Sequence, residues 1–250
     1  MNIAVCIKQV PDTETRIKIA ADNKSIQEQD INFILNPYDE FAVEEALRIK
    51  EAKGGEVTII SLGPDRITSA IRSALAMGAD RAVHIKVMKT PLDAQVTADA
   101  LAKVLSETKY NLILTGKQAI DDDQAQLPSL LAEKLDLPAI TVVTKLTVTD
   151  TDIIAERQIE GGMEKVTCSL PAIISTQRGL NEPRYASLKG IMAAKRIQIQ
   201  EQSLDLSPEN IEIIQITYPP QKPAGRIVGQ GSEAVPELVR LLREEAKVLP

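Results

Sequence analysis

The sequence predicts a doubly wound α/β fold, in which a mostly parallel sheet carries helices on both faces. Over the first ~140 residues, short aliphatic runs alternate with helical patterns, and this order is typical of such sheets. Aromatic residues make up only 2% of the chain and Trp is absent, so the core must be built from Ile, Leu, Val and Ala, as in buried parallel strands. After Pro138 the pattern changes to strands, which predicts a β-rich second half.

The N-terminal part predicts a strand, a long connection and a helix. Residues 3–7 form a short apolar run that reads as the first strand. A polar stretch follows, in which the alternation at residues 16–19 favours a small strand. Asn36 suits the N-cap of a helix that begins at Pro37, and Asp39 would lie near the positive end of its dipole.

The remaining elements follow in order along the chain. Further strands are predicted at residues 57–61, 82–85, 112–114, 146–148, 153–158, 165–169, 172–175 and 211–217. Further helices are predicted at residues 67–77, 93–107, 126–135, 187–196 and 234–248. The last helix is amphipathic and follows a Pro-rich connector, so we expect an arm that packs either on its own domain or on a partner.

Composition excludes several classes of protein. The net charge is -6 with both signs interspersed, and no block of Lys and Arg suggests nucleic-acid binding. Cys6 and Cys168 are the only cysteines, which favours a reduced, cytoplasmic protein. No apolar stretch approaches the ~18 residues of a membrane span. Residues 1–10 read as a strand rather than as a signal peptide.

Familiar catalytic signatures are absent. The Gly-Lys pair at residues 116–117 is no Walker A loop, because Asn111 and Gln118 stand where that motif requires Gly and Ser or Thr. The GQGSEA stretch at residues 229–234 fits a dinucleotide fingerprint, but too few residues follow for a βαβ unit, so it reads as a turn. His84 is the only histidine, which excludes a His-based metal site or triad. We expect no catalytic and no metal-binding residues.

Three loops are candidates for a ligand site. In doubly wound sheets, ligands bind beyond the carboxyl ends of the strands, near the point where strand order reverses. The loops at residues 6–11, 61–64 and 115–123 follow predicted strands and therefore lie at that edge.

The third loop has the chemistry of a nucleotide site. Gly116 allows close backbone approach, Lys117 supplies a cation, and N–H groups at the start of the next helix can hold an anion. The three aspartates at residues 121–123 are suited to capping the helix or to accepting hydrogen bonds from ribose hydroxyls or an adenine amine. A metal site formed by them is conceivable, but the pattern favours a solvated acidic helix start.

Six blocks in fixed order resemble the beta subunit of electron-transfer flavoproteins. They are NPYDEFAVEEA at residues 36–46, ALAMGADR at 74–81, GKQAIDDD at 116–123, RQIEGGMEKVTCSLPA at 157–172, LNEPRYASL at 180–188 and PPQKPAG at 219–225. Together they span nearly the whole chain. The resemblance implies a Rossmann-like, adenine-nucleotide-binding domain over residues 1–225, followed by a connector and helical arm at 226–250 that contacts the partner subunit.

The resemblance also implies an AMP site with a structural role. Carried over to this chain, its residues are Cys6, Asn36, Pro37, Tyr38, Asp39, Leu62, Gly116, Lys117, Gln118, Ala119, Ile120, Asp121, Asp122, Asp123, Gln124, Ala125, Gln126 and Leu127. AMP-binding members usually carry Thr-Gly at the end of the loop, where this chain has Leu127 and Pro128. This departure leaves open a second FAD in the same cavity, as in electron-bifurcating relatives. The blocks at 180–188 and 157–172 look more like the single-flavin group, which favours AMP.

A second implied site is a partner-recognition loop near residues 180–196. Its residues are Arg184, Tyr185, Ala186, Ser187, Leu188, Lys189, Gly190, Ile191 and Met192, with Leu188 as the apolar anchor. Taken without the family, Leu188 would more often be a core leucine before a short helix. Tyr38 either approaches the flavin ring from the interface or packs at its helix start.

The implied function is electron transfer in an obligate heterodimer. FAD, held mostly by the alpha subunit, would be reduced by flavin dehydrogenases such as acyl-CoA dehydrogenases and reoxidised by a quinone reductase or another acceptor. A stand-alone adenine-nucleotide-hydrolysing enzyme and a nucleotide-sensing regulatory module are the competing classes. The hydrolase would need a Gly-rich phosphate loop that this sequence lacks.

Overall fold

The computed structural model describes residues 1–221 and 224–249. The chain divides into two compact units, Met1–Ile214 and Gln215–Pro250. The boundary expected from the resemblance, after residue 225, lies inside the second unit. Within the predicted connector, residues 222–223 lie outside the described residues.

A large sheet is the centre of the first unit. Its strands are β1 (Asn2–Ile7), β4 (Glu56–Gly63), β5 (Arg81–Lys86), β6 (Leu112–Gly116), β7 (Ala139–Val148), β8 (Asp152–Ile159), β9 (Gly162–Ser169), β10 (Ala172–Thr176) and β11 (Ile199–Ser203). In the described residues they form one nine-stranded sheet of order β11-β5-β4-β1-β6-β10-β7-β8-β9. The strands from β11 to β7 are parallel, and β8 and β9 continue the sheet antiparallel. The predicted fold class is confirmed.

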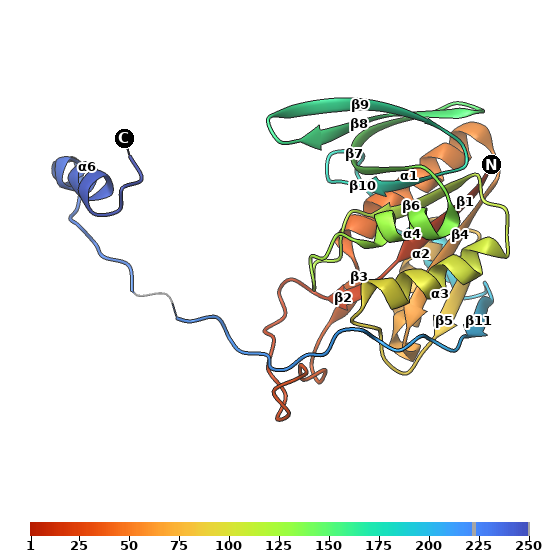
Figure 1. Ribbon diagram of the computed structural model, residues 1–250, viewed down its shortest axis with the longest axis horizontal. Helices are drawn as coiled ribbons and strands as arrows, with labels where there is room; N and C mark the ends of the chain where they lie inside the picture. The colour runs from red at the N-terminus through yellow and green to blue at the C-terminus, as the bar shows by residue number, and fades with distance from the viewer. Residues whose placement is uncertain (222–223, 250) are drawn as a thin grey trace. The chain divides into compact units, whose positions relative to one another are not determined.

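Helices cover both faces of the sheet (Figure 1). The helices α1 (Pro37–Lys53), α2 (Thr68–Met77) and α5 (Leu188–Ala194) pack on one face, and α3 (Ala94–Ser106) and α4 (Leu127–Leu135) on the other. Successive side chains of a strand point to opposite faces, so Ile3, Val5 and Ile7 enter the first core and Ala4 and Cys6 the second. The aliphatic runs of the sequence are therefore buried on both sides.

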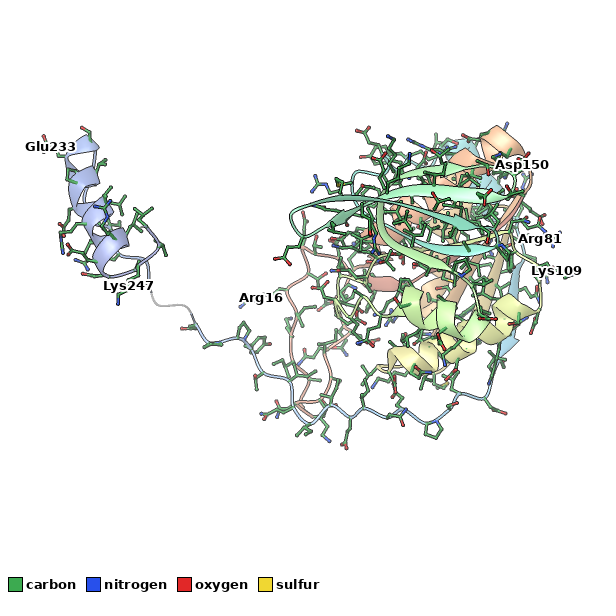
Figure 2. The ribbon with its side chains drawn as sticks, turned by 45° about the horizontal axis from the view of Figure 1, so that its top comes forward. Arg16, Arg81, Lys109, Asp150, Glu233 and Lys247 are labelled. Atoms are coloured by element: carbon green, nitrogen blue, oxygen red, sulfur yellow. The ribbon has the colours of Figure 1, made fainter. Side chains whose placement is uncertain are left out.

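A small second sheet closes the base of a long loop. β2 (Gln9–Pro11) pairs antiparallel with β3 (Phe33–Leu35), and a loop of irregular structure lies between them. The strand expected at residues 16–19 does not form; an isolated bridge joins Ile19 and Ile26 instead. Figure 2 shows Arg16 of this loop on the opposite side of the first unit from Arg81 and Lys109, which lie where β5 and β6 begin. The loop thus extends from the carboxyl edge of the sheet.

The chain after α5 differs from the prediction. Residues 211–217 form no strand, and Ile214 is 84% exposed. The outermost parallel strand is β11, which pairs with β5 although its side chains show no apolar run. Backbone hydrogen bonds to an available edge decide strand formation here, and they carry no signal in the side-chain pattern.

The second unit contains η2 (Ser232–Ala234) and α6 (Val235–Glu244). The predicted helix at 234–248 is therefore present but shorter at its C-terminal end. Arg240 pairs with Glu237 and Glu244 along the polar side of α6. Leu238 and Val239 are 42% and 36% exposed, so much of the apolar side of the helix is uncovered within this unit. Glu233 in η2 and Lys247, just after α6, lie on either side of the helix in Figure 2.

Candidate functional site: a pocket at the carboxyl edge of the sheet

A pocket opens where the strand order reverses. The chain runs outward from β1 through β4 to β5 and then returns to place β6 on the other side of β1. Ligands of open α/β sheets bind at this position. The pocket residues are Cys6, Ile7, Lys8, Asn36, Asp39, Leu62, Thr90, Pro91, Leu92, Ala94, Thr97, Leu101, Thr115, Gly116, Lys117, Gln118, Ala119, Asp122, Gln124, Ala125, Gln126, Leu127 and Pro128.

Most residues expected to hold the nucleotide therefore lie around one cavity. The expected residues that do not line it are Pro37, Tyr38, Ile120, Asp121 and Asp123. Tyr38 lies under Lys117, whose ammonium is 4.9 Å from the centre of the ring. The structure brings the predicted loops together, while nucleotide binding by these residues stays a prediction.

Asn36 joins the start of α1 to the loop after β6. Its side-chain amide donates to the carbonyl of Gln118 over 2.9 Å, and its side-chain oxygen accepts from the N–H of Ile120 over 3.2 Å. Asn36 is 1% exposed and makes no side-chain cap bond to α1. Asn36 is the N-cap residue of α1, as predicted, but its side chain satisfies the backbone of a distant loop rather than that of the helix start.

Asp39 holds two strand ends in place from the first turn of α1. One carboxylate oxygen accepts from the N–H of Lys8 over 2.7 Å and the other from the N–H of Gly116 over 3.0 Å. Burial raises the pKa of Asp39 to about 7, although these hydrogen bonds favour the charged form. A Cβ at position 116 would overlap Asp39 and Tyr38, so glycine is required there by the approach of α1.

Lys8, which directly follows β1, holds the loop after β6 in place through its side chain. Its ammonium donates to Asp121 over 2.8 Å and to Asp122 over 2.9 Å. Burial lowers the pKa of Lys8, but the two carboxylates outweigh burial and raise it overall. The helix-capping role expected for residues 121–123 is wrong, because α4 begins only at Leu127 and the aspartates bind side chains. Asp123 accepts from the side chain of Gln118.

The floor of the pocket consists of neighbouring residues on β1 and β6. Cys6 and Thr115 are paired in register and are 3% and 2% exposed. Burial raises the pKa of the Cys6 thiol to about 12, and the nearby Asp39 carboxylate adds to this effect. The thiol is therefore neutral at physiological pH and acts as an apolar surface rather than as a nucleophile.

One side of the pocket is formed by residues that the sequence pattern did not predict. Thr90, Pro91 and Leu92 from the loop after β5, and Ala94, Thr97 and Leu101 from α3, line the pocket. Gln124 donates from its side chain to the carbonyl of Leu92 over 3.2 Å, so the loops after β5 and β6 meet. A signal was available, because residues 87–93 also follow a parallel strand and must emerge at the same edge.

The start of α4 forms the apolar end of the pocket. Leu127 and Pro128 occupy its first two positions, and Pro128 is buried. Proline has no backbone N–H, so this helix start has one donor fewer for an anion than an ordinary one. The Leu-Pro pair that stands here in place of Thr-Gly therefore leaves this end of the pocket with fewer groups that can bind an anion.

The recognition residues form a second, exposed region on the same unit. Tyr185 and Leu188 are 100% and 84% exposed, and Met192 of α5 is also exposed. Ser187 caps α5 by accepting from the N–H of Gly190 over 3.0 Å. The reading of Leu188 as a core leucine is therefore excluded in this unit.

Arg184 anchors that region to α1. Its guanidinium pairs with Glu44 over 2.7 Å and also with Glu51. Glu44 is 3% exposed; burial raises the pKa of this carboxyl, but hydrogen bonds from Arg184 and Arg48 outweigh burial and lower it overall. Asn181 adds hydrogen bonds to α1 nearby. The exposed side chains therefore project from a segment with a fixed base.

The described residues contain neither a metal-binding cluster nor a membrane-spanning helix. Among residues 1–221 and 224–249, no group of three His, Cys, Asp or Glu side chains is arranged to hold a metal ion. Over the same residues, none of the helices combines the length and apolar character needed to cross a membrane.

Comparison with known proteins agrees with the resemblance seen in the sequence. Residues 24–207 match the family described as electron transfer flavoprotein domain. The chain is 42% identical to the electron transfer flavoprotein subunit beta of Bacillus subtilis and 39% identical to that of Bradyrhizobium diazoefficiens, with all of each chain covered. It is 37% identical to the mitochondrial subunit beta of Arabidopsis thaliana, again with all of both chains covered. The chain therefore belongs to the family of electron transfer flavoprotein beta subunits.

Proposed function

We propose that this chain is the small subunit of a heterodimeric electron-transfer flavoprotein. The heterodimer accepts electrons from flavin dehydrogenases, such as acyl-CoA dehydrogenases, and passes them to a quinone reductase or another acceptor. The observation that carries the proposal is full-length similarity to proteins named as beta subunits of such flavoproteins. A beta subunit implies an alpha subunit, and we place the shared FAD mostly on that partner.

In this proposal the pocket holds AMP in a structural role. Its residues fit an adenine nucleotide in kind: Leu62 and Leu101 offer apolar surface, and Lys117 offers a cation at the rim. The polar groups of Asn36 and Asp39 are occupied by backbone partners and shape the cavity rather than react. FAD supplies the electron-transfer chemistry when bound, and this chain acts as an electron-carrier subunit rather than as an enzyme.

A second FAD in the pocket is the alternative occupant. The start of α4 favours it over a tightly held monophosphate, because Pro128 removes an N–H donor from the place where a phosphate would bind. The blocks at residues 157–172 and 180–188 look more like those of relatives that carry a single flavin. This resemblance supports AMP, and we retain AMP as the proposed ligand.

The test is to identify the nucleotides released by the purified complex. The chain is co-expressed with its alpha subunit, and the expected product is a yellow one-to-one heterodimer that releases one FAD and one AMP on denaturation. Release of two FAD per heterodimer would assign the bifurcating alternative. A colourless monomer that hydrolyses ATP would refute the carrier function altogether.

We further propose that the segment at residues 184–192 docks the dehydrogenase. The 84% exposure of Leu188 on a base fixed by Arg184 suits an apolar anchor. Leu188→Ala should slow electron delivery from the dehydrogenase about tenfold while leaving FAD and AMP content unchanged, because truncating an anchor costs ~1–2 kcal/mol. Ile214→Ala, which truncates an equally exposed side chain outside this segment, serves as the control. Equal rates for both variants would remove the docking assignment.

A cytoplasmic location is also part of the proposal. It is supported by Cys6 and Cys168, which are both unpaired. Plant relatives, in contrast, are named as mitochondrial proteins.

A further inference from the structure

Thr115 carries a hydroxyl that the protein itself does not satisfy. The residue is 2% exposed, and its Oγ1 has no hydrogen-bond partner although it is buried. Its backbone carbonyl is paired, since it accepts from the hydroxyl of Thr176 over 3.1 Å. Buried polar side-chain atoms without a partner are rare in folded proteins and indicate a missing ligand or water.

The side chain of Thr115 faces the pocket. On β6, Ile113 belongs to the core beneath α3 and α4, and the side chain two residues later points to the same face. Cys6, its partner in register on β1, belongs to that core as well. The four partnerless buried atoms found in the described parts of the chain lie on Arg66, Thr115, Asn181 and Gln202, and of these residues only Thr115 lines this pocket.

The surroundings of the hydroxyl suit an uncharged group. Leu62 and Leu101 line the pocket on the same side, and the Cys6 thiol is neutral. The neighbouring residue, Gly116, donates its N–H to the Asp39 carboxylate. A phosphate placed beside Thr115 would lie near this buried carboxyl group, which is partly ionised near pH 7 and would repel it, whereas a purine or ribose carries no charge to be repelled. Lys117, which also lines the pocket, is a better place for the phosphate than the floor beside Thr115.

We propose that the Thr115 hydroxyl hydrogen-bonds the nucleoside end of the bound nucleotide and selects for it. The proposal rests on the nucleotide-binding function proposed above and deepens it by assigning the orientation: base and ribose at the floor, phosphate toward the rim. Thr115 was outside the residues implied by the family resemblance.

The test compares Thr115→Val with the wild type in the purified heterodimer after its nucleotide has been removed. Valine has nearly the same shape and lacks only the hydroxyl. Titration with AMP and with adenosine should show that both bind about tenfold more weakly to Thr115→Val, as expected for one lost hydrogen bond. Thr115→Ser retains the hydroxyl and should bind both ligands close to the wild-type level.

A matched control is available one strand away. Thr176 is fully buried, but its hydroxyl has acceptors within the protein, because the backbone carbonyls of Tyr38 and Thr115 both lie 3.1 Å from its oxygen and share its single proton. Thr176→Val should therefore lower the stability of the nucleotide-free protein, whereas Thr115→Val should leave it unchanged or raise it, because it removes an unpaired group.

Three outcomes would overturn the inference. Unchanged affinity of Thr115→Val for AMP would show that the hydroxyl does not contact the ligand. Loss of AMP affinity with unchanged adenosine affinity would place the phosphate at the floor. Destabilisation of the nucleotide-free Thr115→Val protein, like that of Thr176→Val, would assign the hydroxyl to an internal water. If the wild type binds neither ligand, the proposed nucleotide function fails, which is a separate result.

Discussion

Replacement of Asp39 by asparagine should change the pH dependence of stability in a defined direction. The carboxyl is 5% exposed, and burial raises its pKa from 3.8 to about 7. The folded state therefore holds the proton more tightly than the unfolded state. For a group with a raised folded-state pKa, the stabilisation is fully present below the unfolded value and is lost as the pH rises through the folded one. Asparagine does not titrate, so the variant lacks this dependence.

The size of the effect follows from the two pKa values. Between pH 5 and pH 8, the Asp39 carboxyl should lower the free energy of unfolding of the wild type by about 2–3 kcal/mol relative to Asp39→Asn. The absolute stability of the variant is a separate matter, because an amide cannot accept from both N–H groups of Lys8 and Gly116. The contribution of Asp39 titration is therefore read from how the difference in unfolding free energy between wild type and variant changes with pH.

The assay is denaturant unfolding of wild type and variant at several pH values from 5 to 8. Asp150→Asn makes the same chemical change at a carboxylate whose side chain is 96% exposed, and it should leave the pH dependence unchanged. Carbon NMR of the Asp39 carboxyl gives an independent titration of the folded state. A titration midpoint near 4, or parallel stability curves for wild type and Asp39→Asn, would refute the reasoning.

Two further ion pairs lead to predictions. Lys8→Met should speed release of the pocket ligand about fivefold at low salt, because a partly exposed pair with Asp121 and Asp122 contributes ~1 kcal/mol. Stopped-flow measurements should also show that the release rate of the variant no longer depends on salt. An unchanged release rate would contradict the role of Lys8 in holding the loop after β6. Arg184→Leu should lower the free energy of unfolding by roughly 1–2 kcal/mol in thermal or urea unfolding, because it leaves the buried Glu44 with one partner fewer. The double variant with Glu44→Gln should be less destabilised than the sum of the single changes, and strict additivity would argue against the anchor.

The general architecture could be predicted from the sequence because its signals are local. Aliphatic runs separated by helical patterns require a covered parallel sheet, and the carboxyl ends of parallel strands must share one edge. From these two facts alone the loops at residues 6–11, 61–64 and 115–123 were expected to meet, and residues from each of them line the pocket. The same reasoning applied to residues 87–93 would have found the wall on the side of α3.

Only the tertiary structure decided which groups satisfy one another. Asn36 bonds to Gln118 across 82 positions of the chain, and Lys8 pairs with Asp121 across 113. Local propensity correctly places Asn36 at the N-cap of α1, but it does not show that the side chain bonds to a distant loop. It also assigns the acidic run at residues 121–123 to a helix start, whereas these side chains bind Lys8 and Gln118. Periodicity encodes which face of an element is buried, but hydrogen-bonding and ionic partners depend on how the elements pack. For that reason the unpaired hydroxyl of Thr115 has no counterpart in the sequence pattern.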